Sequence, residues 1–233
     1  MSSYRIAGLL VEMDTFGRTA RQAAPYQTAD AAPDMTVRAE PEVLAQAAKM
    51  GRDYAEYLAT GASFYRQLVR FDGMMLHASC VVVDGRAYLF SAPCGTGKST
   101  HVSLWLREFG DRAYILNDDK PALRFLPDGT LRVFGTPWCG KHGLSRNADA
   151  PLGGIAFLER AEENAIRPMS GKEAVYALME QTVRKLPGDQ ILQCMELIDR
   201  IVADGKLWKL SCNMKPAAAR LSYQTMSGKE VLE

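Results

Sequence analysis

Midway along the 233-residue chain stands the segment Ala92-Pro93-Cys94-Gly95-Thr96-Gly97-Lys98-Ser99-Thr100. It fits the phosphate-loop pattern G-x-x-x-x-G-K-[ST] except at the opening glycine, which is Ala92 here. Gly95 and Gly97 allow backbone N–H groups to converge on phosphate oxygens, and a helix from Lys98 adds the positive end of its dipole. We therefore expect all nine residues to contact a nucleoside triphosphate, with Lys98 bridging the β- and γ-phosphates and Ser99 on magnesium.

The surroundings of this loop predict an α/β core. The dipeptide Asp84-Gly85 favours a tight hairpin between two β-rich runs just before the loop, and helical spacing follows over residues 100–109. A strand before the loop and a helix after it favour the phosphate-binding interpretation over a chance match. Strands are expected at residues 79–83, 86–90, 114–116, 122–125, 130–134, 154–159 and 208–212.

The ends of the chain predict a thin N-terminal lobe and a helical C-terminal part. Residues 4–13 and 34–40 are typical of strands, with a loop over 19–33 between them, and helical spacing begins at Pro41. Further helices are expected from Lys172 through residue 186, after the Pro187-Gly188 break, and from Pro216. We thus predict a small β/helical lobe over residues 1–70 and a phosphate-loop domain over 71–233.

A pair of carboxylates follows the short strand 114–116, as Asn117-Asp118-Asp119. A magnesium-dependent site needs a carboxylate at the end of a neighbouring strand, so we assign Asp118 to the metal. Asp119 is assigned to accepting the proton of an acceptor hydroxyl. The alternative is a solvated acidic turn, because this composition is also ordinary in turns.

Three further positions carry weaker signals. His77, just before the hairpin, could donate to the γ-phosphate, although a lone histidine is more often structural. The loop from Gly135 to His142 would suit an acceptor or nucleotide contact, but Trp138 could equally be a core residue and Lys141 a solvated one. Arg184 is a candidate charge clamp at the γ-phosphate, with an exposed helix position as the stronger explanation.

The composition narrows the class of protein. The chain has 28 Lys and Arg against 27 Asp and Glu, a net charge of +1, so a nucleic-acid partner is disfavoured. The five cysteines are odd in number and form no C-x-x-C pair, so we expect reduced thiols in the cytoplasm. The apolar run 6–11 is too short to span a bilayer and follows no basic cluster, so neither an export signal nor a membrane partner is expected.

Together these features resemble the catalytic domain of the HPr kinase/phosphorylase family, over roughly residues 70–160 and less surely the C-terminal helices. The shared features, in order, are Leu76-His77-Ala78-Ser79, the Asp84-Gly85 hairpin, the loop 92–100 and Asp118-Asp119. A loop entered from a hairpin strand is also found in ATP-dependent phosphoenolpyruvate carboxykinases. The resemblance implies a P-loop kinase fold of this type with a mixed sheet, ATP and Mg²⁺ as cofactors, and His77 near the transferred phosphate. Members often form oligomers.

The sequence also departs from that family. The glutamate-containing motif of true HPr kinases is absent, and the segment from Gly135 to His142 takes its place. The N-terminal lobe is also short. Both departures favour one of the shorter HPr-kinase-like proteins, some of which phosphorylate peptides made by biosynthetic clusters.

The leading hypothesis is an ATP- and Mg-dependent kinase that acts on a hydroxyl, either Ser or Thr of a peptide or protein or the hydroxyl of a small molecule. The alternative is a nucleotide-binding regulatory module that hydrolyses ATP slowly. The second carboxylate favours the kinase, because a substrate proton must be removed. A carboxykinase is disfavoured by the short chain, and a regulatory GTPase by the absence of an Asn-Lys-x-Asp motif at Asn117.

Overall fold

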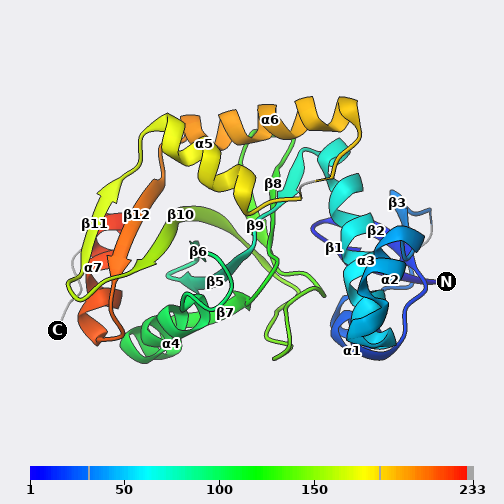
Figure 1. Cartoon of the computed structure of the whole chain (residues 1–233), viewed down its shortest axis with the longest axis horizontal. Coiled ribbons are helices and arrows are strands. Elements are labelled where there is room, and N and C mark those ends of the chain that lie inside the picture. Colours follow the sequence, from blue (N-terminus) through cyan, green and yellow to red (C-terminus); the bar gives the residue numbers. More distant parts are fainter. Residues whose placement is uncertain (31, 184, 230–233) are drawn as a thin grey trace.

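The structure is a computed structural model that describes residues 1–30, 32–183 and 185–229. It is a mixed α/β protein in which a small lobe of strands and helices packs beside a large sheet (Figure 1). The helices are α1 (Gly17–Ala23), α2 (Pro41–Ala47), α3 (Arg52–Leu68), α4 (Lys98–Phe109), α5 (Gly171–Glu180), α6 (Gly188–Ala203) and α7 (Pro216–Ser227).

The N-terminal lobe differs in two places from the sequence prediction. Instead of one strand over 4–13, the chain forms an antiparallel hairpin of β1 (Ser2–Ile6) and β2 (Leu9–Met13), and β3 (Met35–Val37) pairs parallel to β2. The hairpin turns at Ala7 and Gly8, both with positive φ. The loop predicted over 19–33 is also wrong at its start, because α1 occupies 17–23. This helix packs on α3, where Thr19 bonds to Glu56.

Nine of the described strands form one mixed sheet. Its main path runs β4-β8-β9-β10-β6-β5-β7, with β12 paired to β10 and β11 paired to β12. The strand β11 was not predicted from the sequence. The strands are β4 (Gly73–Met75), β5 (Ala78–Val83), β6 (Arg86–Ser91), β7 (Ala113–Asn117), β8 (Ala122–Phe125), β9 (Leu131–Phe134), β10 (Asp149–Arg160), β11 (Ala165–Pro168) and β12 (Leu207–Cys212).

Helices cover both faces of this sheet, which explains the near-continuous apolar runs of β5 and β6. Side chains alternate between the faces: Cys80 and Val82 pack towards α5 and α6, whereas Val81 and Val83 pack towards α4 and α7. In Figure 1, α5 and α6 lie above the strands and α4 lies below them. The connection from β6 to α4 therefore begins at the C-terminal end of an interior strand, in a sheet that helices pack on from both sides.

The helix expected from Lys172 through residue 186 ends earlier, at Glu180. Tertiary contacts stop it: the Gln181 carbonyl accepts from the His77 backbone N–H at 2.8 Å, and the Thr182 hydroxyl donates to the Met75 carbonyl at 2.7 Å. These bonds tie the segment after α5 to β4 and to the stretch that leads into β5. The start of α5 has a capping box, in which Ser170 and Glu173 satisfy each other's backbone N–H groups.

The N-terminal lobe packs on the large sheet through aromatic side chains. Trp138 is fully buried against Phe64 and Tyr65, with ring centroids 4.8 and 5.4 Å apart respectively. A Cβ at Gly61 would come within 2.9 Å of the Trp138 ring, so α3 approaches this ring as closely as a helix can. The lobe and the sheet therefore share one apolar cluster, which fixes α3 above the ends of β7 and β8.

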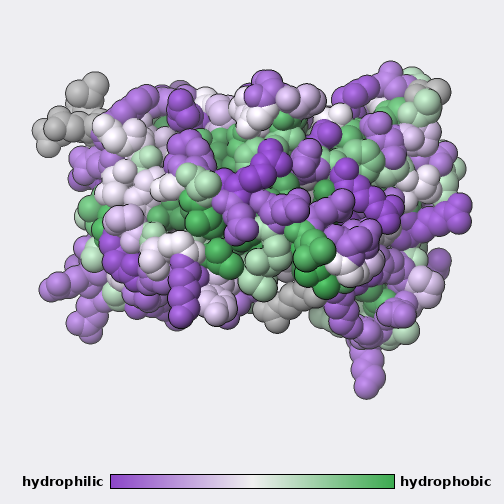
Figure 2. Space-filling model, turned by 90° about the horizontal axis from the view of Figure 1, so that it is seen from above, coloured by the Kyte–Doolittle hydropathy of each residue, from purple (hydrophilic) through white to green (hydrophobic). Residues whose placement is uncertain are grey.

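The helices of the described segments include none that is long and apolar enough to cross a membrane. Figure 2 views the face that carries α5 and α6 and shows hydrophobic areas among hydrophilic ones. The exposed large apolar residues on these two helices are Tyr176, Met179, Ile191 and Leu192.

Candidate functional site

The glycine-rich loop connects β6, the second strand of the hairpin, to α4. Gly95 and Gly97 have φ of 81° and 123°, a backbone conformation that other residues adopt only with strain. Lys98 and Ser99 occupy the first turn of α4, whose N-terminal N–H groups face the loop. The geometry agrees with the expected strand–loop–helix arrangement.

Lys98 contacts its own loop and also lines the cavity that contains both aspartates. The residue is only 8% exposed, and Nζ donates to the Ala92 carbonyl at 2.8 Å. Burial lowers the pKa of this ammonium. A buried ammonium needs an acceptor, and the opening residue of its own loop supplies it.

Oxygen atoms from three elements meet beside Lys98. The Ser79 hydroxyl on β5 donates to Asp118 Oδ1 at 2.6 Å and lies 3.5 Å from the Ser99 hydroxyl. Magnesium is held in proteins by one or two carboxylates with hydroxyls, waters and phosphate oxygens, so this donor set fits it. Ser79 received no role in the sequence analysis, although it stands near the start of β5, the first strand of the hairpin that leads to the loop.

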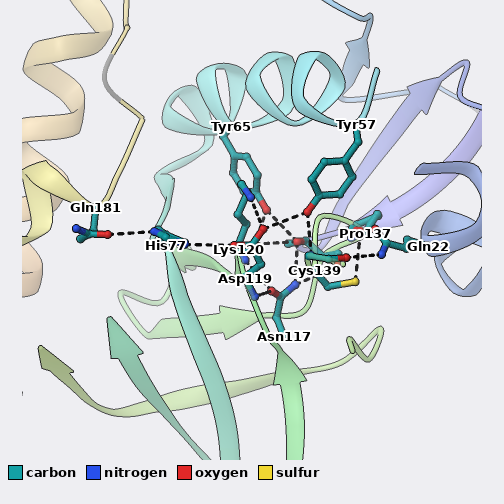
Figure 3. A network of polar contacts seen from close by, with 12 residues as sticks. Gln22, Tyr57, Tyr65, His77, Asn117, Asp119, Lys120, Pro137, Cys139 and Gln181 are labelled. Carbon is teal, nitrogen blue, oxygen red and sulfur yellow. Dashed lines mark hydrogen bonds and ion pairs between the residues drawn. The ribbon is translucent and has the colours of Figure 1, made fainter. Parts of the chain in front are cut away.

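The side chain of Asp119 lies in a polar network between the two lobes (Figure 3). Its Oδ1 is 3.4 Å from His77 Nε2, and its Oδ2 accepts from the Tyr57 hydroxyl at 3.2 Å and pairs with Lys120. Burial would raise the pKa of Asp119, but the bonds from His77 and Lys120 outweigh it and lower the pKa to about 2. The carboxylate is therefore ionised at neutral pH.

Asn117 sets the direction of the two carboxylates. This fully buried side chain accepts from the backbone N–H groups of Asp119 and Lys120 at 2.9 and 2.8 Å, and donates to the Thr136 carbonyl. The acidic turn of the alternative interpretation therefore exists, as an Asx-type turn. Both aspartates are partly buried, and the Asp119 side chain is 19% exposed.

His77 lies between Gln181 and Asp119 (Figure 3). Its Nδ1 is 3.1 Å from Gln181 Oε1, and its ring faces the cavity that contains the glycine-rich loop. The structure thus brings His77 to Asp119, and both to the loop, as the expected arrangement requires. Arg184, the candidate charge clamp, lies outside the described residues.

In the loop from Gly135 to His142, some residues are buried in the core and others line the cavity. Trp138 is core, so a contact of this side chain with nucleotide or acceptor is excluded by its burial. Gly140 donates its N–H to the Tyr57 hydroxyl at 2.9 Å, while Lys141 and His142 line the cavity with Asp118 and Asp119. Burial raises the pKa of Cys139 to about 12, so this thiol stays protonated.

Two of the cavities that residues of the loop line lie on different sides of it. The first, of about 510 Å³, contains Lys98, Ser99 and both aspartates, together with Arg18, Tyr54 and Tyr57 of the N-terminal lobe. The second, of about 400 Å³, lies on the other side, between the start of α4 and the ends of β10 and β12, and Leu104, Leu158, Cys212 and Met214 line it. Its Arg160 donates to the Thr96 carbonyl at 3.0 Å and also to Gly95.

Tyr57, Arg18 and Arg160 could not be assigned to the site from the sequence, because each is far from the loop along the chain. Among the described residues, no group of three or more His, Cys, Asp or Glu side chains is arranged to hold a metal ion.

The fold and this site define a mixed α/β protein whose glycine-rich loop joins a hairpin strand to a helix beside a partly buried pair of aspartates. A family model, described as SynChlorMet cassette protein ScmC, matches residues 55–203, which is more than half of the chain. The chain therefore belongs to the ScmC family. No curated protein gives a match.

Among solved structures, the chain is similar to the HPr(Ser) kinase/phosphatase from Coxiella burnetii. The two share 15% sequence identity over 56% of this chain and 88% of that chain, with a TM-score of 0.30. A TM-score this low does not establish a common fold.

Proposed function

We propose that the protein is an ATP- and Mg²⁺-dependent kinase that transfers the γ-phosphate to an acceptor hydroxyl. The observation that carries the proposal is that Asp119 faces the same cavity as Lys98 and Ser99 of the glycine-rich loop. A nucleotide-binding module has no need of a second carboxylate at this place, whereas a kinase needs an acceptor for the hydroxyl proton.

The loop geometry supports a phosphate site at residues 92–100. Helix α4 directs its N-terminal N–H groups at the loop, and Gly95 and Gly97 let the backbone approach an anion closely. On nucleotide binding, Lys98 would exchange the Ala92 carbonyl for β- and γ-phosphate oxygens, because its ammonium already lies at the loop. The apolar cavity beside α4 would hold the nucleoside.

Ser99 and Asp118 would hold Mg²⁺, with Ser79 close enough to join or support them. Bound there, the ion supplies positive charge between the β- and γ-phosphates. The acceptor oxygen forms its bond to the γ-phosphorus as the bond to the β–γ bridging oxygen breaks, and ADP leaves. The acceptor proton passes to Asp119. A base with so low a pKa suffices, because in a loose transition state the hydroxyl becomes acidic only as the new bond forms.

We also propose the finer fold assignment, a P-loop kinase core of the HPr kinase and carboxykinase type over residues 71–233. The antiparallel β5–β6 hairpin that leads into the loop supports it. In this arrangement residues 1–70 form the lobe that closes the acceptor side, since Tyr57 and Arg18 reach the cavity from there. A cytoplasmic location stays a prediction.

The substitution Lys98→Ala tests the phosphate site. We expect Mg-ATP affinity to fall by at least about tenfold, because a charge-assisted contact to phosphate is lost. Titration calorimetry measures it, and Lys172→Ala, an exposed lysine on α5, is the matched control. A thermal melt of each variant separates lost binding from lost folding. Equal affinities of Lys98→Ala and wild type would remove the phosphate-site assignment.

A further inference from the structure

The cavity at Asp119 continues into a second one along the N-terminal lobe. The two have volumes of about 510 and 360 Å³ and share Arg18, Lys141 and His142 as lining residues. The second runs away from the glycine-rich loop, past Arg21 and Tyr26. A small molecule with one hydroxyl would fill only the part at Asp119. The continuation offers room for a chain on one side of the acceptor hydroxyl.

Positive charge lines this groove. Arg18, Arg21 and Lys141 lie along it, and Asp118 and Asp119 of the transfer site are its only carboxylates among the described residues. Within the part of the chain that the structure describes, none of these three cations forms an ion pair with a carboxylate. The whole chain is nearly neutral, so this concentration of unpaired cations is local. It would attract an acidic ligand.

A side chain of α1 connects one wall of the groove to the loop after β9. Gln22 lines the groove and is fixed by donating its Nε2 to the Gly140 carbonyl at 2.8 Å. Its Oε1 is buried and has no hydrogen-bond partner among the described residues. The bond from Gln22 to Gly140 holds α1 and the loop after β9 together along the groove.

The ring of Tyr57 lies between Arg18 and Asp119. The Arg18 guanidinium lies over the Tyr57 ring, 5.5 Å from its centroid, and the hydroxyl of that ring donates to Asp119 at 3.2 Å. An extended chain advances about 3.3 Å per residue. A carboxylate held by Arg18 would therefore be within about three residues of the hydroxyl at Asp119, with Arg21 and Lys141 serving positions further along.

We infer that the phosphate acceptor is a Ser or Thr within an acidic peptide segment, whose carboxylates lie on Arg18, Arg21 and Lys141 in the groove between α1 and the loop 140–145. The inference depends on the proposed kinase function for the identity of the acceptor. The groove itself is a feature of the N-terminal lobe and of the loop after β9, so peptide binding is measurable without phosphate transfer.

The test uses two fluorescein-labelled peptides with one central Ser, flanked either by Asp and Glu or by Lys and Arg. Fluorescence anisotropy with the full chain, Mg²⁺ and a non-hydrolysable ATP analogue should show at least about tenfold tighter binding of the acidic peptide, weakening with salt. The double variant Arg21→Glu with Lys141→Glu should bind the basic peptide better than the acidic one. Arg21→Lys with Lys141→Arg should keep the preference for the acidic peptide.

The control variant, Arg107→Glu with Lys172→Glu, changes the net charge by the same amount as the groove variant does. Its substitutions lie on α4 and α5, away from the groove, so it should bind the peptides like wild type. Equal binding of the two peptides, or an unchanged preference after charge reversal in the groove, would overturn the inference. Displacement of the acidic peptide by a single-stranded DNA oligonucleotide of equal charge would also overturn it, by showing a general polyanion surface.

Failure of the inference is distinguishable from failure of the proposed function. If wild type does not bind Mg-ATP, the kinase proposal fails whatever the peptides show. If wild type binds Mg-ATP and phosphorylates the acidic and basic peptides at equal rates, the kinase proposal stands and the acidic acceptor is wrong.

Discussion

At the scale of single residues, the site depends on side chains that lie far apart in the sequence. Asp119 is held by His77, Lys120 and Tyr57, and the sequence indicated the first because it stands just before the hairpin that leads to the loop. Tyr57 could not be predicted. It lies 62 residues from Asp119, on a helix whose apolar spacing indicates only that one face is buried.

Tyr57→Phe tests whether this hydroxyl positions the carboxylate. Its loss frees Asp119 from one donor and leaves the Gly140 N–H without its acceptor, so we expect a stability loss of about 1 kcal/mol. Turnover should fall by roughly 3- to 30-fold while the KM for Mg-ATP stays constant, because only the acceptor side is disturbed. A rise in that KM with unchanged turnover would show that Tyr57 serves nucleotide binding instead.

At the scale of the elements, α4 connects the loop to the rest of the fold. Its His101 is buried between Ser222 of α7, with Nε2 3.1 Å from the Ser222 hydroxyl, and the ring of Phe90. Its Nδ1 has no partner among the described residues. Burial lowers the pKa of His101 to about 4, because a charged ring would lack both water and a counter-ion.

This lowered pKa predicts a pH dependence of stability. Between about pH 6.5 and pH 4 the unfolded chain binds a proton at His101 and the folded chain does not, so the free energy of unfolding falls as the pH falls through this window. The loss attributable to His101 should approach about 3 kcal/mol, from a shift of about 2.5 pKa units at about 1.4 kcal/mol each. Urea unfolding of wild type and His101→Gln measures it, and the variant should show a shallower pH slope here. Equal slopes would contradict the account.

The helices and strands also differ in how well their bounds could be predicted from the sequence. The loop, α4 and the β5–β6 hairpin were predictable because their signals are local: glycine pairs, a turn dipeptide and short-range spacing. The end of α5 could not be predicted, because helical spacing of apolar residues continues past Glu180. Hydrogen bonds of Gln181 and Thr182 with the β4 region end the helix instead. The helix α1 was hidden in a stretch with weak periodicity, and only its packing on α3 stabilises it.

At the scale of the whole molecule, two cavities meet at the glycine-rich loop. Cys94 lies in this loop, is exposed, and lines the cavity that contains Asp119. Cys80, Cys139 and Cys194 are buried, so Cys94 should be the first thiol to react with iodoacetamide. We expect saturating Mg-ATP to slow its labelling by about tenfold or more, measured by peptide mass mapping. Equal labelling rates with and without Mg-ATP would place the nucleotide elsewhere.

In the proposed function, Asp119 accepts the proton while Asp118 holds the metal. The most direct measurement is Mg-ATP affinity, by calorimetry, beside the rate of ADP formation in wild type, Asp118→Asn and Asp119→Asn. The account predicts that Asp119→Asn keeps its affinity within about threefold but loses roughly 100-fold or more in turnover. Asp118→Asn should lose Mg-dependent affinity by about tenfold or more. Full turnover in Asp119→Asn, with its affinity unchanged, would contradict the account.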